Sequence, residues 1–290
     1  MATEVELEHH TVATNGIHLH VVQAGPSDGP LVILLHGFPE FWYGWHQQIR
    51  DLAARGFRVW APDQRGYNLS DRPKGIGAYR VDTLANDIVG LIDAAGRAKA
   101  YVAGHDWGAM IAWWLALKHA DRLHRVAILN VPHPNVMRQH VFSSLTQLRK
   151  SWYIFFFQLP GLPEAAIRRD NWSVGARALR GSSRPGTFTD ADLAEYRRAW
   201  SQPGAITGML NWYRAIARRP PAKLADAYVH IPALIIWGAQ DMALDAVMAP
   251  ASVNYCEQGR LVLIPDATHW VQHEEPARVS ALLAEHFGAA

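Results

Sequence analysis

Short apolar runs recur along this chain, and each is rich in β-branched or large aliphatic residues. They lie at residues 31–35, 58–61, 100–103, 126–129, 233–237 and 261–264. Continuous apolar runs of this length predict strands buried on both faces, as in a parallel sheet. Between them lie amphipathic segments such as residues 81–95, where Leu84, Ile88 and Leu91 recur at helical spacing. The alternation predicts a doubly wound α/β fold with a mostly parallel sheet.

The start of the chain has a different pattern. Apolar and polar residues alternate at 11–14 and again at 18–22, and Asn15-Gly16 stands between these segments. Asn-Gly favours the tight turn of a two-residue β-hairpin, because both turn positions there take positive φ angles. The sheet is therefore expected to begin with two antiparallel strands.

The strand pattern stops after residue 129 and returns at residue 233. Residues 134–222 are helical in pattern, rich in Trp, Tyr, Phe and Arg, and interrupted by the Pro-Gly pairs at 160–161, 185–186 and 203–204. We expect an all-helical insertion, while residues 1–133 and 223–290 form the α/β core. Ligands of open α/β sheets bind at the carboxyl ends of the strands, so the insertion is interpreted as a lid over that edge.

The composition narrows the class of protein. Of the 290 residues, 49% are hydrophobic and 19% charged, which suits a large buried core. A formal net charge of +2, without any block of Lys or Arg, gives no support for nucleic-acid binding. Cys256 is the single cysteine, so we expect neither an internal disulfide nor a thiol catalyst. The polar N-terminus and the short apolar runs predict no signal peptide and no membrane span, hence a cytoplasmic protein.

Asp106 stands in a motif that predicts a nucleophile. It is the centre of Gly104-His105-Asp106-Trp107-Gly108, between the strand at 100–103 and an apolar helix at 109–119. A strand-to-helix turn this sharp needs small residues on both sides, because Cβ atoms there would meet the backbone. The turn lifts the central side chain above the sheet at a helix N-terminus. An aspartate that merely caps a helix is the alternative, but it leaves both glycines unexplained.

An aspartate at this position points to chemistry at saturated carbon. A serine there would attack acyl carbon, whereas a carboxylate can displace a leaving group from an alkyl carbon and form an ester on the enzyme. Water can then hydrolyse that ester, while the ether that serine would form could not be opened in this way. Asp106 therefore favours epoxides or alkyl halides as substrates.

A base for the second step is expected near the C-terminus. His269 follows the strand at 261–264, in the chain order nucleophile, acid, histidine that this kind of fold uses. It would take a proton from the hydrolytic water. Asp241, after the strand at 233–237, would orient the imidazole, with Asp245 as the alternative acid.

The segment after the strand at 31–35 predicts hydrogen-bond donors for the tetrahedral step. The backbone N–H groups of Phe38 and Trp107 would form an oxyanion hole, and Pro39 is a candidate for a cis peptide bond. The side chains of His36 and His105 are interpreted as structural.

Five segments together resemble the soluble epoxide hydrolases of the α/β-hydrolase superfamily. They are HGFPEFWYGW at 36–45, DQRGYNLSD at 63–71, GHDWGAMIAWW at 104–114, NWYRA at 211–215 and THWVQHEEP at 268–276. The likeness covers nearly the whole chain, including the helical insertion. It implies an α/β-hydrolase fold and conversion of a small hydrophobic epoxide and water to a diol, without a cofactor or metal.

The same resemblance implies two lid tyrosines. Tyr213 stands in NWYR, and Tyr153 lies five residues before the Gln of SWYIFFFQ. Opening an epoxide generates an alkoxide, and phenols can donate a hydrogen bond or a proton to it. Phe38, Pro39, Trp107 and Trp270 are expected to contact the substrate. A monomer and a homodimer are both compatible with the sequence.

Two rival functions use the same motifs. A dehalogenase also has an aspartate at this turn, but its halide needs N–H donors rather than phenols. A non-catalytic small-molecule receptor could keep the fold. Replacement of the nucleophile or of the histidine would then be expected, but the sequence has both Asp106 and His269.

Overall fold

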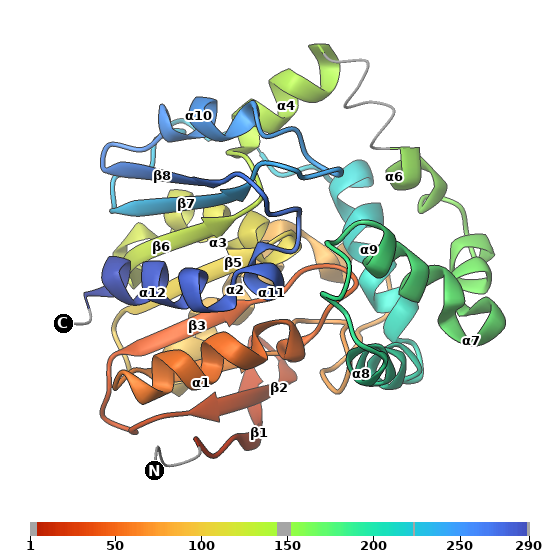
Figure 1. Cartoon of the computed structure of the whole chain (residues 1–290), viewed down its shortest axis with the longest axis horizontal. Coiled ribbons are helices and arrows are strands. Elements are labelled where there is room, and N and C mark those ends of the chain that lie inside the picture. Colours follow the sequence, from red (N-terminus) through yellow and green to blue (C-terminus); the bar gives the residue numbers. More distant parts are fainter. Residues whose placement is uncertain (1–4, 144–151, 223, 289–290) are drawn as a thin grey trace.

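The computed structural model describes residues 5–143, 152–222 and 224–288. In these residues eight strands form one sheet in the order β1-β2-β4-β3-β5-β6-β7-β8 (Figure 1). β1 pairs antiparallel with β2 and β2 antiparallel with β4, and all other neighbours are parallel. The strands are β1 (Glu8–Thr14), β2 (Ile17–Ala24), β3 (Leu31–Leu35), β4 (Arg58–Pro62), β5 (Ala100–His105), β6 (Leu123–Leu129), β7 (Ala233–Gly238) and β8 (Gly259–Ile264).

The expected hairpin and the expected buried strands are present, with one correction. Asn15 and Gly16 both have positive φ, 43° and 76°, as the Asn-Gly turn predicts. β3, β5, β6 and β7 are almost entirely buried. β8 is not buried on both faces as predicted, since Leu263 is 45% exposed. The reason is its position at the edge of the sheet, where it pairs with β7 alone.

Helices cover both faces of this sheet. On one face α1 packs against α12, and on the other α2 packs against α3 (Figure 1). α10 contacts β7 and β8. The bounds are α1 (His46–Ala54), α2 (Val81–Ala94), α3 (Trp107–Lys118), α10 (Met248–Val253), α11 (Val271–Glu274) and α12 (Pro276–Phe287). Short 3₁₀ turns lie at Trp42–Trp45, Ile76–Tyr79 and Ala120–Arg122.

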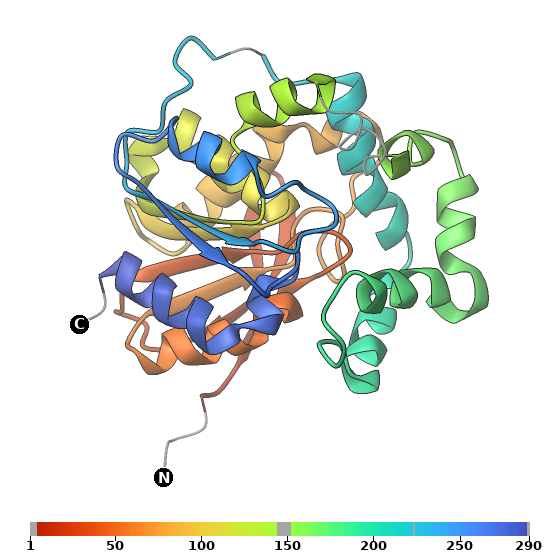
Figure 2. The same cartoon turned by 45° about the horizontal axis from the view of Figure 1, so that its top comes forward.

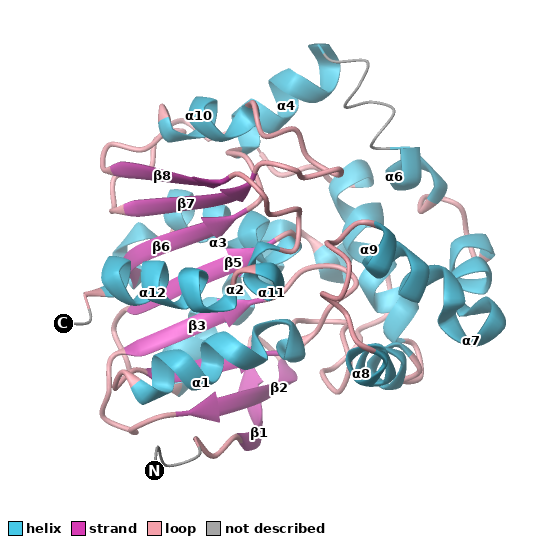
Figure 3. Cartoon of the chain, viewed as in Figure 1, coloured by secondary structure: helices cyan, strands magenta, loops and turns pink. Residues whose placement is uncertain are grey.

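The described residues between β6 and β7 contain further helices. They are α4 (Pro134–Ser143), α6 (Trp152–Phe156), α7 (Leu162–Gly181), α8 (Asp190–Trp200) and α9 (Ala205–Arg218). The parallel strands point toward α6 to α9, which lie beyond their carboxyl ends (Figures 2 and 3). α4 instead packs against α10. None of the described helices is long and apolar enough to cross a membrane.

Local signals explain how two of these helices begin and bend. Thr189 caps α8 through a capping box with Asp192, in which each side chain bonds the backbone N–H of the other. α7 is interrupted where Asp170, Asn171 and Trp172 take positive φ angles. The interruption turns the second half of α7 back toward the carboxyl edge of the sheet (Figure 1).

Candidate active site

Asp106 occupies a sharp turn between β5 and α3. Its φ and ψ are 50° and −120°, a conformation that L-residues rarely adopt. A Cβ on Gly108 would lie 2.1 Å from the carbonyl oxygen of Leu35, and one on Gly104 would lie 2.3 Å from the oxygen of Gly108. Both glycines are therefore sterically required, and the turn presents the carboxylate at the carboxyl edge of the sheet.

The loop after β3 contacts this carboxylate closely. The Phe38 N–H donates to Asp106 Oδ1 at 2.6 Å. A Cβ on Gly37 would lie 2.3 Å from Asp106 Cβ, so the backbone of Gly37 packs directly against the Asp106 side chain. The Phe38–Pro39 peptide bond is cis, as the sequence suggested. Trp107 is the first residue of α3, which places its N–H at the N-terminus of that helix.

His269 and Asp241 meet beside Asp106. His269 Nδ1 lies 2.7 Å from Asp241 Oδ2, and His269 Nε2 lies 3.7 Å from Asp106 Oδ2. Asp241 Oδ1 accepts the N–H groups of Ala243 and Leu244 at 2.7 and 2.9 Å. Asn130 donates to Asp241 Oδ2 at 2.8 Å. The carboxylate is thus fixed from three directions and holds the imidazole toward Asp106.

Asp245, the alternative acid, is placed differently. Its side chain is 39% exposed and lies 3.8 Å from His140 Nε2. One of its oxygens accepts the N–H of Val247 at 3.3 Å. The residue that contacts His269 is therefore Asp241.

The charges of this cluster favour an ion pair between His269 and Asp241. Burial alone would lower the pKa of His269, but the charge and hydrogen bond of Asp241, together with the Asp106 carboxylate 3.7 Å away, raise that pKa to about 10. Burial would likewise raise the pKa of Asp241, yet the charge of His269 and several hydrogen bonds hold it below its ordinary value. The charges around His269 therefore favour the protonated imidazole.

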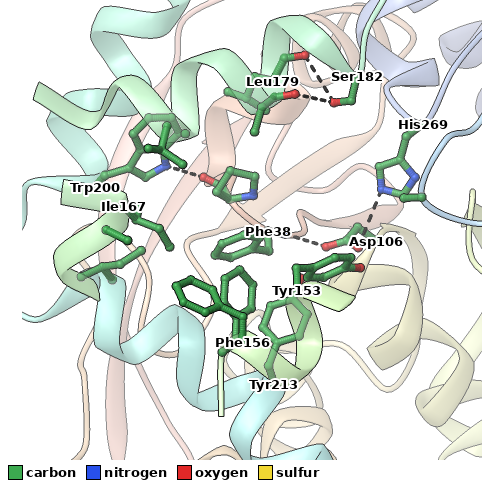
Figure 4. Close-up of a pocket in the computed structure, with 18 of the residues that line it drawn as sticks. Phe38, Asp106, Tyr153, Phe156, Ile167, Leu179, Ser182, Trp200, Tyr213 and His269 are labelled. Atoms are coloured by element: carbon green, nitrogen blue, oxygen red, sulfur yellow. Dashed lines mark hydrogen bonds and ion pairs between the residues drawn. The ribbon is translucent and has the colours of Figure 1, made fainter. Parts of the chain in front are cut away.

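Tyr153 on α6 and Tyr213 on α9 face Asp106 across the cavity (Figure 4). Their ring centroids are 5.9 Å apart. Burial, and next the charge of Asp106, raise the pKa of both phenols well above the ordinary tyrosine value. Both side chains therefore stay protonated and can donate hydrogen bonds into the space above Asp106.

The space between these groups is a cavity of about 400 Å³ with an almost wholly apolar wall. Asp106, His269, the two tyrosines, Phe38, Pro39 and Trp270 contribute to this wall. Its far side is formed by α7, α8 and α9, through Ala166, Ile167, Val174, Gly175, Ala178, Leu179, Trp200 and Ile206, and by Ser182 directly after α7. Val174 and Met242 line it as well and are 40% and 55% exposed. The wall suits a hydrophobic ligand with a single polar, reacting end.

Two residues singled out from the sequence lie outside this wall. Asp241 lies behind His269, which it contacts through Nδ1. Trp107 packs edge-on against the ring of Tyr213, with centroids 4.9 Å apart. Trp107 therefore supports a tyrosine from behind the cavity in this structure.

His36 and His105 both bridge segments of the core. His36 Nδ1 lies 3.0 Å from the Gly37 carbonyl oxygen, and its Nε2 accepts the N–H of Gln64 at 3.0 Å. His105 Nε2 lies 2.8 Å from the carbonyl oxygen of His269. These contacts join the loops that surround Asp106.

A buried polar network surrounds Glu40, a residue that the sequence patterns did not single out. The Glu40 carboxylate lies 2.6 Å from His273 Nε2, 3.1 Å from His105 Nδ1 and 2.8 Å from the hydroxyl of Tyr196 on α8. Burial would raise its pKa, but the two histidines hold that pKa well below the ordinary value. A signal existed in the sequence, since Glu40 is the one charged residue in the run 36–45. Asn130 was missed too, although it directly follows β6 at the carboxyl edge.

Comparison with known proteins agrees with this fold. The family model described as alpha/beta hydrolase fold matches residues 30–276, so the chain is an α/β hydrolase. It is 48% identical to the AB hydrolase superfamily protein YfhM of Bacillus subtilis, over 95% of this chain and 96% of the relative. It is 37% identical to epoxide hydrolase A of Mycobacterium tuberculosis, over 94% of this chain and 95% of the relative.

A solved structure extends this similarity to three dimensions. A mutant of an epoxide hydrolase from Bacillus megaterium superposes with a TM-score of 0.87 at 30% identity, over 96% of this chain and 99% of the other. The chain belongs to the epoxide hydrolase family of the α/β-hydrolase superfamily, and it is an enzyme, a hydrolase.

Proposed function

We propose that the enzyme converts a small hydrophobic epoxide and water to a vicinal diol through a covalent ester on Asp106. The observation that carries this proposal is the placement of one carboxylate opposite two phenols in an apolar cavity. A carboxylate is the nucleophile that saturated carbon requires, and phenols are donors suited to an epoxide oxygen.

In the first step Asp106 Oδ2 attacks one epoxide carbon from the side opposite the oxygen. The Oδ2–C bond forms and the C–O bond of the epoxide breaks. Tyr153 and Tyr213 hydrogen-bond the oxygen as charge develops on it. One of these phenols then gives the alkoxide a proton and recovers a proton through solvent from His269, whose pKa falls once Asp106 is an ester. Asp106 Oδ1 keeps the hydrogen bond from the Phe38 N–H at 2.6 Å, which holds the nucleophile in place.

In the second step water attacks Asp106 Cγ. His269 takes the proton of the water, and the negative charge of the tetrahedral intermediate develops on Oδ1, which Phe38 N–H and Trp107 N–H stabilise. The Cγ–Oδ2 bond then breaks, and the leaving oxygen takes the proton from His269. The diol leaves with the former Oδ2 as one of its oxygens, and the Asp106 carboxyl passes its remaining proton to His269, which restores the starting state.

The first step also prepares His269 for the second. A neutral ester replaces the Asp106 carboxylate, and one of the negative charges that raise the pKa of His269 is removed. The pKa of His269 falls as a result, and the imidazole can accept a proton. Asp241 remains to orient the ring and to stabilise its charge during that transfer.

We further propose that residues 134–222 act as a cap on a core formed by residues 1–133 and 223–290. α6 and α9 supply the two tyrosines, while α7 and α8 supply much of the apolar wall. The cap thereby selects the substrate and keeps bulk water from the ester, whereas the core supplies the groups that make and hydrolyse it.

A direct test compares two substrates of similar size. Styrene oxide and an aryl-substituted bromoethane are each incubated with the wild-type enzyme and with Asp106→Asn, and diol and bromide are measured. Diol formation that depends on Asp106 is the expected result. Bromide release without diol would favour a dehalogenase, and stoichiometric binding of the epoxide without turnover would favour a receptor.

A further inference from the structure

Beyond the groups that react, a buried carboxylate joins the loop of His269 to the connection between α7 and α8. Glu274 is the last residue of α11, and its side chain is 0% exposed. Burying a carboxylate is costly unless donors surround it. Glu274 is placed among such donors, and they come from both segments.

Thr268, the residue before His269, supplies two of these donors. Its backbone N–H donates to Glu274 Oε2 at 2.7 Å, and its hydroxyl donates to Oε1 at 2.7 Å. The same hydroxyl lies 3.4 Å from the Trp270 N–H. Glu274 therefore fixes the backbone on the N-terminal side of His269.

Arg184, in the connection between α7 and α8, supplies the others. Its backbone N–H donates to Glu274 Oε1 at 2.7 Å, and its Nε lies 3.5 Å from Oε2. Its guanidinium also donates to the Glu274 carbonyl oxygen and, at 2.9 Å, to Glu275. In the same connection Ser182 accepts the Trp270 indole N–H at 2.9 Å, and it lies near His269 on the cavity wall (Figure 4).

We propose that Glu274 is a positioning residue, which sets the distance between His269 and Asp106 by docking the α7–α8 connection onto both residues that flank His269. The inference rests on the proposed function, because it concerns the hydrolysis of the ester. The separation of 3.7 Å between His269 Nε2 and Asp106 Oδ2 must admit a water in line with the ester carbon. A shift of about an ångström at such a site can slow the reaction up to about 100-fold.

Loss of the Glu274 hydrogen bonds should affect only the hydrolysis of the ester. Asp106 is held by the β5–α3 turn and by Phe38, neither of which contacts Glu274 through the hydrogen bonds of the described residues. The tyrosines come from α6 and α9. Loss of the Glu274 bonds is therefore expected to slow hydrolysis of the ester while its formation continues.

Glu274→Gln is an informative variant. Its amide can face Thr268 or Arg184 with the NH₂ group, but in either orientation one backbone N–H loses its acceptor. Glu275→Gln is the matched control. It removes the same charge from the adjacent position and from the same arginine, but Glu275 is 32% exposed and makes no hydrogen bond to Thr268 among the residues that the structure describes.

The experiment measures both steps with an aryl epoxide in single turnovers, by rapid quenching and mass analysis of the Asp106 peptide. Glu274→Gln is expected to slow ester hydrolysis about 10- to 100-fold, to change ester formation less than about 2-fold, and to raise the steady-state fraction of ester. Glu275→Gln should match the wild type. Equal slowing of both steps, or equal behaviour of the two variants, overturns the inference.

A second pair of variants serves if Glu274→Gln does not fold. Thr268→Val removes only the hydroxyl donor, and Thr268→Ser keeps it. Thr268→Val should slow hydrolysis alone and Thr268→Ser should not, whereas identical rates for both contradict the inference. If the wild type forms no ester on Asp106, the proposed function and the inference fail together. If it does and the variants show no difference, the inference alone fails.

Discussion

The two halves of the candidate site are held by different kinds of interaction. In the sheet half, Asp106, His269 and Asp241 are fixed by short hydrogen bonds and by close backbone contacts at Gly104 and Gly108. In the helical half, Tyr153 and Tyr213 are placed by ring packing. Tyr153 lies 5.6 Å from Phe157 and Tyr213 lies 5.3 Å from Phe38, as ring centroids.

This difference indicates a division of labour. Hydrogen bonds and backbone contacts at the carboxyl edge define positions within tenths of an ångström, which covalent chemistry requires. Aromatic packing tolerates substitution and repacking, which suits the half that accommodates a substrate. The sheet half should therefore resist sequence change, and the helical half should tolerate it except at the two phenols.

The largest effect is expected when both phenols of the helical half are removed. Replacing both Tyr153 and Tyr213 with Phe should abolish epoxide opening, and each single replacement should slow ester formation about 100-fold. The rate of ester formation in single turnovers measures this. Tyr228→Phe, at an exposed tyrosine, is the control. Retained activity in the double variant would contradict the role of the two phenols and would favour the dehalogenase alternative.

Removal of the base in the sheet half should slow the second step, hydrolysis of the ester. His269→Gln is expected to leave ester formation measurable but to slow hydrolysis about 10³-fold, because the base for water is lost. The Asp106 peptide should then carry the added mass of the epoxide. His124→Gln, at an exposed histidine of β6, is the control. A turnover rate in His269→Gln close to that of wild type would exclude His269 as the base.

Two glycine variants compare how substitutions in each half change the free energy of unfolding. Gly108→Ala in the sheet half would place Cβ 2.1 Å from a backbone oxygen, so we expect a loss of at least about 4 kcal/mol in the free energy of unfolding. Gly175→Ala in α7 would place Cβ 3.0 Å from the Trp200 ring, which can shift. Gained helix propensity of ~1 kcal/mol should nearly offset that shift. Thermal denaturation of both variants checks the contrast, and equal losses would contradict it.

The smallest effect is a dependence of stability on pH. The pKa of His269 is about 10 in the folded protein against 6.5 without these partners, so its charge stabilises the fold below about pH 6.5. That stabilisation is lost as pH rises through about 10. Asp106→Asn removes part of the cause, and its Tm should fall less between pH 7 and 10, by roughly 2–4 °C. Identical Tm profiles would show that Asp106 does not raise this pKa.

The turn that carries Asp106 could be predicted from the sequence because its determinants are local. Two glycines four residues apart, a strand before them and a helix after them define the turn of Asp106. Asp241 and Asp245 could not be separated in this way. The choice depends on Asn130 and on two backbone N–H groups, and no local pattern encodes those contacts.

The prediction of Tyr153 and Tyr213 in the helical half depended on the resemblance to soluble epoxide hydrolases. Tyr153 lies among phenylalanines, and packing in three dimensions decides which of these rings faces the cavity. Glu274 was not visible for the same reason, since its partner Arg184 is 90 residues away in the chain. The exposure of β8 likewise follows from its place at the sheet edge, which its own apolar sequence does not reveal.

The central claim is that Asp106 forms an ester whose carbonyl carbon is attacked by water. One turnover of an aryl epoxide in water enriched in heavy oxygen, with enzyme in excess, tests this most directly. We predict that the label enters the Asp106 carboxylate, found by mass analysis of the peptide that contains it, and that the first diol is unlabelled. Label in the diol alone would contradict the account.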